Sequence, residues 1–213
     1  NHELCEELFA DLERRGLKLT SRIIFITDGG KGVIKALRDR FAKKLIHVRC
    51  AIHKSRNIQK ALAKKYRKAA HKRLMDALKQ NLYVDAKKML ADFEKWLRNI
   101  NESAADSLKE ALEELLTLHR LKITGKLRRV LYTTNPIESM FSTVRDCEGN
   151  IKRYRGTKMM QRWLAAILFH CEEGFKRVHG YRMIAEAVSV IEKQQAQKKT
   201  VQQHHEELLQ LAA

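Results

Sequence analysis

The chain lacks any apolar run long enough to cross a membrane and any pattern that would pair its cysteines. Its longest apolar stretch, residues 163–169, is far short of the roughly 18 residues that a membrane-spanning helix needs. The four cysteines are scattered, and no signal peptide is visible. These absences argue against a membrane-spanning or disulfide-built protein, and we expect a cytoplasmic protein with reduced thiols.

Three familiar enzyme motifs are missing as well. There is no nucleophile elbow, no dinucleotide fingerprint and no phosphate-binding loop, because residues 29–32 (Gly-Gly-Lys-Gly) lack the spacing of a nucleotide-binding loop. We therefore expect no dependence on ATP. The chain does not begin with Met, which favours an excised domain or an incomplete reading frame over an ordinary trimmed N-terminus.

Acidic residues are scarce, and this scarcity dominates the composition. Lys and Arg number 43 against 25 for Asp and Glu, giving a formal net charge of +18. From Ala42 to Leu74 there are twelve basic residues and no acidic one. Such a surplus indicates a polyanionic partner, most commonly nucleic acid, with a membrane surface as the rival. We expect one helical face here to follow a DNA backbone in a salt-sensitive contact, and an ordinary solvated face is the alternative.

Hydrophobic patterning indicates a mostly helical α/β fold. Residues 23–26 form a β-rich apolar run typical of a strand buried on both faces, and residues 45–48 form a second strand. A helix with an apolar face over residues 33–41 lies between them. The unit is therefore βαβ, which predicts parallel strands joined by a right-handed crossover.

Helical periodicity continues on both sides of this unit. An opening helix carries Leu4, Leu8 and Leu12 one turn apart and ends at Gly16. After the second strand no further strand is clear, and residues 103–106 predict a capping box at the start of a helix. The large apolar residues that we expect in the core of these helices are Phe93, Trp96, Leu97, Trp163 and Phe169. For Trp96, stacking on a base is the alternative.

Two carboxylates stand where metal-dependent chemistry would place them. Asp28 follows the first strand, at the edge where open α/β sheets bind ligands, and the glycines after it allow close approach of a metal or phosphate. Glu138 stands in the first turn of a later helix. Carboxylate oxygens suit Mg²⁺ or Mn²⁺, which cut phosphodiesters with two ions about 4 Å apart. Each has a structural alternative, since Asp28 can cap a helix and residues 135–138 can form a capping box.

Two further features accompany this pair. Arg145 lies seven residues after Glu138 on the same helical face, where it would hold a phosphate; a solvated surface charge is the alternative. Cys50 and His53, spaced as Cys-x-x-His, are two good zinc ligands, but no second pair completes such a site. The residues favour a buried cysteine and a hydrogen-bonded histidine near a strand end.

Three separated motifs, taken in order, resemble the mutator-type transposases of bacterial insertion sequences. The motifs are Asp28-Gly29, residues 49–57 (Arg-Cys-Ala-Ile-His-Lys-Ser-Arg-Asn) and residues 134–141 (Thr-Asn-Pro-Ile-Glu-Ser-Met-Phe) with Arg145. The resemblance runs from about Leu4 to about Phe175. It implies an RNase H-like fold with a DDE triad and an all-helical insertion between the second Asp and the Glu.

The resemblance implies a role for individual residues. Asp28 would be the second catalytic metal ligand and Glu138 the third, holding Mg²⁺ or Mn²⁺. The residues that would support the active site are Cys50, His53 and Asn135. The residues expected to contact DNA are Arg145, Lys54, Arg56, Lys64, Lys65, Arg67 and Lys68. The implied segments are a partial RNase H-like segment at 1–57, the insertion at 58–130, completing helices at 131–193 and a polar tail at 194–213.

One departure limits the expected activity. In the family the first Asp lies on a strand upstream of the opening helix, and the acidic residues on that helix cannot replace it: Glu3, Glu6, Glu7, Asp11 and Glu13. We expect the chain to lack that ligand and the first strands of the sheet, and so not to cleave DNA by itself.

The expected function is the catalytic portion of a transposase that cleaves and joins DNA at insertion-sequence ends. The expected partners are terminal-repeat and target DNA, with a homo-oligomer at full length, in the bacterial cytoplasm at the nucleoid. The alternative is a non-catalytic DNA-binding remnant or regulatory fragment. A weaker alternative is an unrelated helical protein whose basic face binds RNA.

Overall fold

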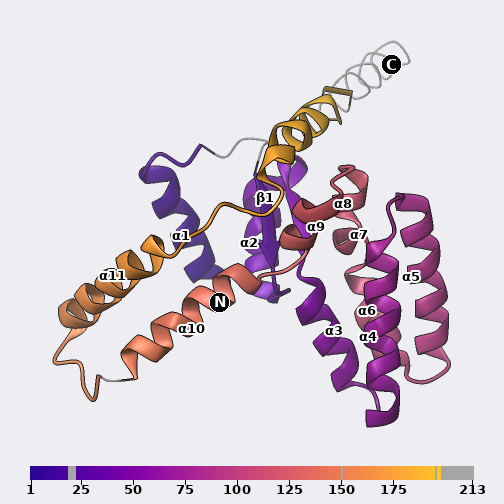
Figure 1. The fold of residues 1–213 in the computed structure, drawn as a ribbon, viewed down its shortest axis with the longest axis horizontal. Coiled ribbons are helices and arrows are strands. Elements are labelled where there is room, and N and C mark those ends of the chain that lie inside the picture. The colour runs from indigo at the N-terminus through magenta and orange to yellow at the C-terminus, as the bar shows by residue number, and fades with distance from the viewer. Residues whose placement is uncertain (19–22, 150, 195, 198–213) are drawn as a thin grey trace, which may run out of the picture.

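Two short parallel strands lie at the centre of the molecule, and helices surround them (Figure 1). The computed structural model describes residues 1–18, 23–149, 151–194 and 196–197. Strands β1 (Ile24–Thr27) and β2 (Ile46–Arg49) pair in parallel, from Ile24 opposite Ile46 to Thr27 opposite Arg49. The elements between them are α2 (Lys31–Phe41) and the 3-10 helix η1 (Ala42–Lys44). The predicted parallel βαβ unit is therefore confirmed.

The burial of β1 differs from the prediction. All four residues of β1 are half-buried, whereas His47, Val48 and Arg49 of β2 are buried. Within the described residues β1 has one strand neighbour, β2, so one of its edges is left without a strand partner. The apolar run at residues 23–26 thus marks a strand, but not one covered on both faces.

Helix α1 (His2–Arg14) packs against α2, but not through the predicted face. Phe9 is its buried residue, and Cys5 and Leu12 are the partly buried residues beside it. These three positions form an i, i+4, i+7 stripe. Leu4 and Leu8 lie off this stripe and are exposed, so the leucine spacing identified the helix but not its core-facing side.

Four helices form a separate bundle with a core of its own, beside the sheet (Figure 1). They are α3 (Ala51–Lys60), α4 (Lys64–Lys79), α5 (Tyr83–Arg98) and α6 (Glu102–Glu110). Phe93 and Leu97 are buried in this core and Trp96 packs against it, as predicted. The predicted capping box at 103–106 is wrong, because the side chain of Asn101 caps α6 by accepting the Ala104 N–H at 2.9 Å.

Short helices lead the chain back from the bundle to the sheet. They are α7 (Leu112–Leu115), α8 (Thr117–Arg120) and α9 (Gly125–Leu131). Leu118 and Leu127 from these helices share a buried cluster with Val48 of β2 and Ile191. The 3-10 helix η2 (Tyr181–Met183) leads into helical residues 184–194, which bring Ile191 to this cluster.

Helices α10 (Asn135–Glu148) and α11 (Thr157–Glu173) form a hairpin that projects away from the sheet (Figure 1). Val144, Ile167 and Cys171 are the buried residues between them. Trp163 and Phe169 are 46% and 70% exposed, so their predicted place in the core is wrong. The side of α11 that faces α10 carries residues 164, 167, 168 and 171, and neither aromatic residue lies on that stripe.

No helix among the described residues is long and apolar enough to cross a membrane. Of the predicted polar tail at 194–213, residues 195 and 198–213 lie outside the described residues.

A buried histidine connects the helical bundle to the returning helices. The His119 ring on α8 donates from Nε2 to the carbonyl oxygen of Gln80, 3.0 Å away. Arg128 on α9 donates to the same oxygen at 2.7 Å. Burial, together with the nearby Arg128 charge, lowers the pKa of His119 to about 4. The ring is therefore neutral in the folded protein at neutral pH.

Replacing His119 with Gln is expected to flatten the acid dependence of stability. The folded-state pKa of about 4 lies below the ordinary value of 6.5, so the unfolded chain takes up the proton first. Stability contributed by the neutral ring is complete above pH 6.5 and is lost as the pH falls toward 4. The loss should be about 3 kcal/mol. Urea unfolding across this pH range measures it, and equal slopes for the variant and the parent chain would contradict it.

Candidate active site

Asp28 lies at the carboxyl end of β1, in a turn that leads into α2. Its Oδ1 accepts the Gly30 N–H at 3.0 Å, an Asx turn that holds the carboxylate in place. Gly30 occupies the N-cap position of α2, so Asp28 is not the cap of that helix. Asp28 is exposed, and its second carboxylate oxygen has no hydrogen bond or ion pair within the described residues.

Gly29 lets the turn pass close over a buried arginine. Its φ of +101° lies in the region that favours glycine. A Cβ at this position would lie 1.7 Å from Nη1 of Arg49. The glycine therefore serves two needs at once, since the backbone conformation and the space beneath it both exclude a side chain.

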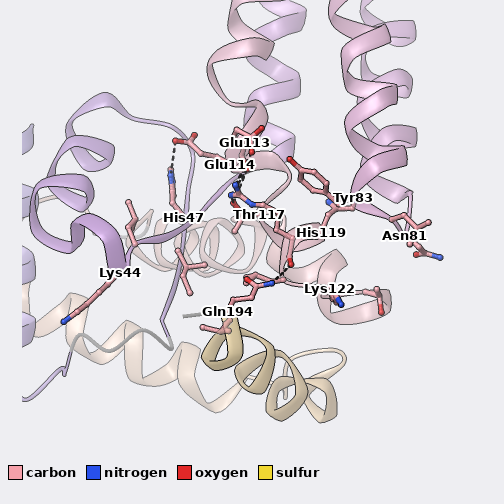
Figure 2. Close-up of a pocket in the computed structure, with 17 residues that line it drawn as sticks. Lys44, His47, Asn81, Tyr83, Glu113, Glu114, Thr117, His119, Lys122 and Gln194 are labelled. Atoms are coloured by element: carbon pink, nitrogen blue, oxygen red, sulfur yellow. Dashed lines mark hydrogen bonds and ion pairs between the residues drawn. The ribbon is translucent and has the colours of Figure 1, made fainter. Parts of the chain in front are cut away.

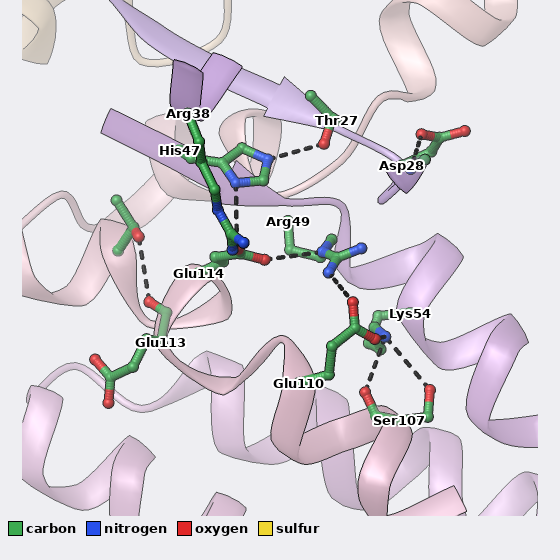
Figure 3. Close-up of polar contacts among 12 residues, drawn as sticks. Thr27, Asp28, Arg38, His47, Arg49, Lys54, Ser107, Glu110, Glu113 and Glu114 are labelled. Atoms are coloured by element: carbon green, nitrogen blue, oxygen red, sulfur yellow. Dashed lines mark hydrogen bonds and ion pairs between the residues drawn. The ribbon is translucent and has the colours of Figure 1, made fainter. Parts of the chain in front are cut away.

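Arg49, at the end of β2, is buried and bound by two carboxylates (Figure 3). Its Nη2 donates to Glu110 Oε1 at 2.5 Å, and its Nε donates to Glu114 Oε2 at 3.0 Å. Glu114 also faces Nδ1 of His47 at 3.4 Å, and the other ring nitrogen of His47 lies 2.8 Å from the Thr27 hydroxyl. These contacts join both strands to the end of α6 and to α7.

Lys54 belongs to this buried network and not to a DNA-binding surface. The residue is 1% exposed. Its Nζ donates to the Ser107 carbonyl at 2.8 Å and to Glu110 Oε2 at 3.1 Å. Burial lowers the pKa of Lys54, and Glu110 works against that shift. The prediction that Lys54 contacts DNA is therefore wrong, because its ammonium group is enclosed and already paired.

Glu114 is held in its charged form. Burial on its own would raise the pKa of this carboxyl, but His47 and Arg49 outweigh burial and lower the pKa to about 2. The stability that the ionised group contributes is complete above pH 4.5 and is lost as the pH falls through about 2.

Glu138 lies in the first turn of α10, and the capping box that was the structural alternative for this residue does not form. Thr134 occupies the N-cap position, and its hydroxyl donates to Glu138 Oε1 at 2.7 Å. Asn135 is exposed within the helix, and its backbone N–H donates to the Thr133 hydroxyl at 3.2 Å. The Glu138 side chain is 38% exposed, and its other oxygen, Oε2, lies 3.7 Å from Arg56.

Cys50 and His53 lie directly beside Glu138. Nδ1 of His53 lies 3.4 Å from Cys50 Sγ and 3.6 Å from Glu138 Oε1. Thr134 donates its backbone N–H to the Cys50 sulfur at 3.4 Å. Burial would raise the pKa of Cys50, but hydrogen bonds from Thr134 and His53 outweigh it and lower the pKa to about 7. Cys50 is buried and His53 is hydrogen-bonded, as the sequence favoured.

Backbone hydrogen bonds bring Asp28 and Glu138 to the same edge of the sheet. The Cys50 N–H donates to the carbonyl of Thr27, the residue before Asp28, at 2.8 Å. The Ala51 N–H donates to the carbonyl of Tyr132, just before α10, also at 2.8 Å. The donor atoms of Cys50, His53 and Glu138 all lie within 4.8 Å of one another, in a group that does not include Asp28.

Most of the other predicted DNA-binding residues lie at the surface. Arg56 on α3 has an exposed side chain beside Glu138. The first five residues of α4 place four exposed basic side chains together: Lys64, Lys65, Arg67 and Lys68. Arg145, near the end of α10, is exposed as well. These residues are available to a polyanion, in contrast to Lys54.

A cavity of about 1070 Å³ opens elsewhere, where β2 begins (Figure 2). His47, Glu114 and His119 are among the residues that line it. Asp28 and Glu138 do not line it, because they lie at the carboxyl edge of the sheet. The cavity is therefore not part of the candidate active site.

The sequence model described as "Transposase, Mutator family" matches residues 1–178. The chain belongs to the Mutator family of transposases. It is also 32% identical over 147 residues to the transposase for insertion sequence element IS6120 of Mycolicibacterium smegmatis. That match covers 67% of this chain and 43% of the relative, so it spans less than half of the relative's length. The resemblance drawn from the three motifs is confirmed.

Sequence reasoning missed the residues that support this edge of the transposase chain. The Thr134 hydroxyl was seen only as part of a motif, yet it lies against Cys50, His53 and Glu138 together. Glu110 and Glu114 neutralise Arg49. The spacing of these two glutamates, four residues apart, was visible, but nothing in the sequence identified partners more than sixty residues away.

Replacing Glu114 with Gln is expected to lower the free energy of unfolding by about 3–5 kcal/mol, because it removes one partner of a buried ion pair. The matched control is Glu113→Gln, whose ion pairs with Arg120 and Lys87 are half-exposed and worth about 0–1 kcal/mol. Urea unfolding at neutral pH compares the two. Equal losses would show that the buried network does not carry this stability.

Proposed function

We propose that the chain is the catalytic portion of a transposase that binds DNA and supports metal-dependent cleavage and strand transfer at insertion-sequence ends. The observation that carries the proposal is the position of Asp28 and Glu138. They belong to two of the separated motifs in which the sequence resembles the family, yet backbone hydrogen bonds through Cys50 and Ala51 bring them to one edge of the sheet. That edge is where open α/β sheets bind their ligands.

The donor atoms at this edge fit a hard divalent cation. Asp28 and Glu138 offer carboxylate oxygens, which Mg²⁺ and Mn²⁺ prefer. One oxygen of Asp28 has no partner within the described residues, and the Glu138 side chain is partly exposed. A bound metal would supply activation of the attacking hydroxyl or water and neutralisation of the leaving oxygen. The opening helix α1 carries carboxylates that are already paired, such as Glu6 with Arg40, and we assign none of them to the site.

The neighbouring residues hold Glu138 and approach the DNA. Thr134 and His53 contact Glu138 Oε1 and keep the carboxylate against the edge of the sheet. Arg56 adjoins the other oxygen and would pair with a phosphate brought to the site. Arg145 lies two turns further along α10, where it would contact the DNA backbone.

The DNA-binding surface proposed for the chain is the start of α4 together with Arg56. Lys64, Lys65, Arg67 and Lys68 are exposed, and the chain from Ala42 to Leu74 holds no acidic residue that would oppose them. Basic side chains that neutralise phosphates give affinity that is independent of sequence and sensitive to salt. The helical insertion would therefore hold the DNA while the edge of the sheet carries the chemistry.

Changing Lys64, Lys65, Arg67 and Lys68 to Gln is expected to weaken binding to duplex DNA by at least about tenfold, because four phosphate-neutralising charges are removed. The slope of log affinity against log salt should fall by about 0.9 for each phosphate that is no longer neutralised. The matched control changes Lys87, Lys88, Lys95 and Lys109 to Gln, which removes the same charge from exposed positions on α5 and α6. If the two variants lost the same affinity for DNA, the start of α4 would contribute only through its share of the net charge, and not as a specific binding surface.

Cleavage of a terminal-repeat duplex in Mn²⁺ tests the catalytic part of the proposal. Activity that disappears in Asp28→Ala and in Glu138→Ala, with DNA binding retained, supports metal-dependent cleavage by this chain. Salt-sensitive binding without cleavage agrees with the expectation from the sequence that the chain does not cleave DNA by itself, and supports the second candidate, a non-catalytic DNA-binding fragment. Cleavage that survives both substitutions would remove these carboxylates from the mechanism.

A further inference from the structure

Three metal-ligating side chains from separate parts of the chain converge beside the sheet. Cys50 lies between β2 and α3, His53 lies in the first turn of α3, and Glu138 lies in the first turn of α10. Their sulfur, nitrogen and oxygen donor atoms lie within 4.8 Å of one another. The Cys-x-x-His spacing provides only two of the ligands of a zinc site. The fold adds a third, Glu138, which lies more than eighty residues away in the sequence.

The distances approach those of a tetrahedral zinc site. With Zn–S near 2.3 Å and Zn–N or Zn–O near 2.0–2.1 Å, tetrahedral geometry separates the ligand atoms by about 3.3–3.6 Å. Nδ1 of His53 lies 3.4 Å from Cys50 Sγ and 3.6 Å from Glu138 Oε1. The third pair, the Cys50 sulfur and a Glu138 carboxylate oxygen, lies within 4.8 Å, and rotation of the partly exposed Glu138 side chain would bring the two atoms closer.

The Thr134 hydroxyl marks the point on which the three ligands converge. Its oxygen lies 2.7 Å from Glu138 Oε1, 3.3 Å from His53 Nδ1 and 3.4 Å from Cys50 Sγ. A metal bound near this point would take over the contacts of the hydroxyl, which rotation of Thr134 about χ1 would move aside. His53 and Glu138 are 28% and 38% exposed, so the site has an entry path and room for water as a fourth ligand.

The backbone around the site is already fixed without a metal. The Thr134 N–H donates to the Cys50 sulfur, and the Ala51 N–H donates to Tyr132. These bonds join the start of α3 to the start of α10, the two elements that carry the ligands. Hydrogen bonds that orient ligands in this way raise metal affinity.

We propose that Cys50, His53 and Glu138 form a binding site for Zn²⁺. Its ligand set differs from that of the Mg²⁺ or Mn²⁺ site proposed at Asp28 and Glu138, which we call the hard-metal site. A thiolate and an imidazole are poor ligands for Mg²⁺ and good ones for zinc. Asp28 is not in the group, so the two sites share only Glu138.

The shared ligand makes the two sites competitors. Zinc bound through Glu138 Oε1 withdraws this carboxylate from the metal that Asp28 would hold, and so blocks DNA cleavage. This consequence rests on the proposed function, whereas zinc binding itself does not.

Titration of the 213-residue chain with Co²⁺, a coloured substitute for Zn²⁺, tests the site without any activity measurement. We expect one Co²⁺ per chain, a thiolate-to-cobalt absorption band, and loss of that band when Zn²⁺ is added. Cys50→Ser should abolish the band. Glu138→Gln and His53→Asn should retain a band but weaken Co²⁺ affinity by at least about tenfold, because each removes a direct ligand.

The matched control is Cys147→Ser, which alters a partly buried cysteine outside the group of three ligands and should leave the band unchanged. Circular dichroism confirms that each variant is folded before titration. A band that survives Cys50→Ser, or Co²⁺ binding without a thiolate band, would overturn the zinc site.

A second substitution separates this inference from the proposed function. Asp28→Asn should leave the Co²⁺ band unchanged and weaken binding of Mn²⁺. Cys50→Ser should abolish the Co²⁺ band and leave binding of Mn²⁺ unchanged. Loss of the Co²⁺ band in Asp28→Asn would refute two separate ligand sets. If the parent chain gave a normal Co²⁺ band but did not bind Mn²⁺, the hard-metal site would be contradicted and the zinc site would stand.

Discussion

The buried charge of Arg49 is the constraint on which this end of the molecule depends. A guanidinium at the end of a central strand is tolerable only when carboxylates neutralise it inside the protein. Glu110 and Glu114 do so, and they lie where the helical bundle returns to the sheet. The same side chain fills the space beneath Gly29 and so sets the path of the turn that carries Asp28. One ion network thus positions the bundle, the sheet edge and a candidate catalytic residue together.

The network also explains how the molecule uses its few acidic residues. The acid-free stretch that contains Arg49 and Lys54 cannot neutralise these charges locally, so the fold supplies Glu110 and Glu114 from beyond α5. Basic residues of the same stretch that remain unburied, such as Lys64, keep their charge at the surface. Burial therefore divides one basic segment into a structural part and a part that is exposed and available to a polyanion.

The two proposed metal sites share Glu138. Across the sheet edge it shares the hard-ligand character of Asp28, and on its own side it faces the sulfur of Cys50 and the imidazole of His53. The Thr134 hydroxyl lies against all three side chains of the proposed zinc site. It donates a hydrogen bond to Glu138 and holds that carboxylate on the side of Cys50 and His53. If both proposals hold, this carboxylate would be a point of control, because whichever metal it bound would decide what the edge can do.

The sequence alone determined the βαβ unit and the family, because apolar periodicity and motif order can be read along the chain, and it predicted Asp28 and Glu138 as candidate metal ligands. It also indicated that Cys50 is buried. It could not distinguish Lys54 from Lys64, since both are lysines in one basic stretch and only packing encloses the first. The tertiary structure alone brought Glu138 to Cys50 and His53, because contacts across more than eighty residues depend on how helices return to the sheet and leave no periodic trace in the sequence.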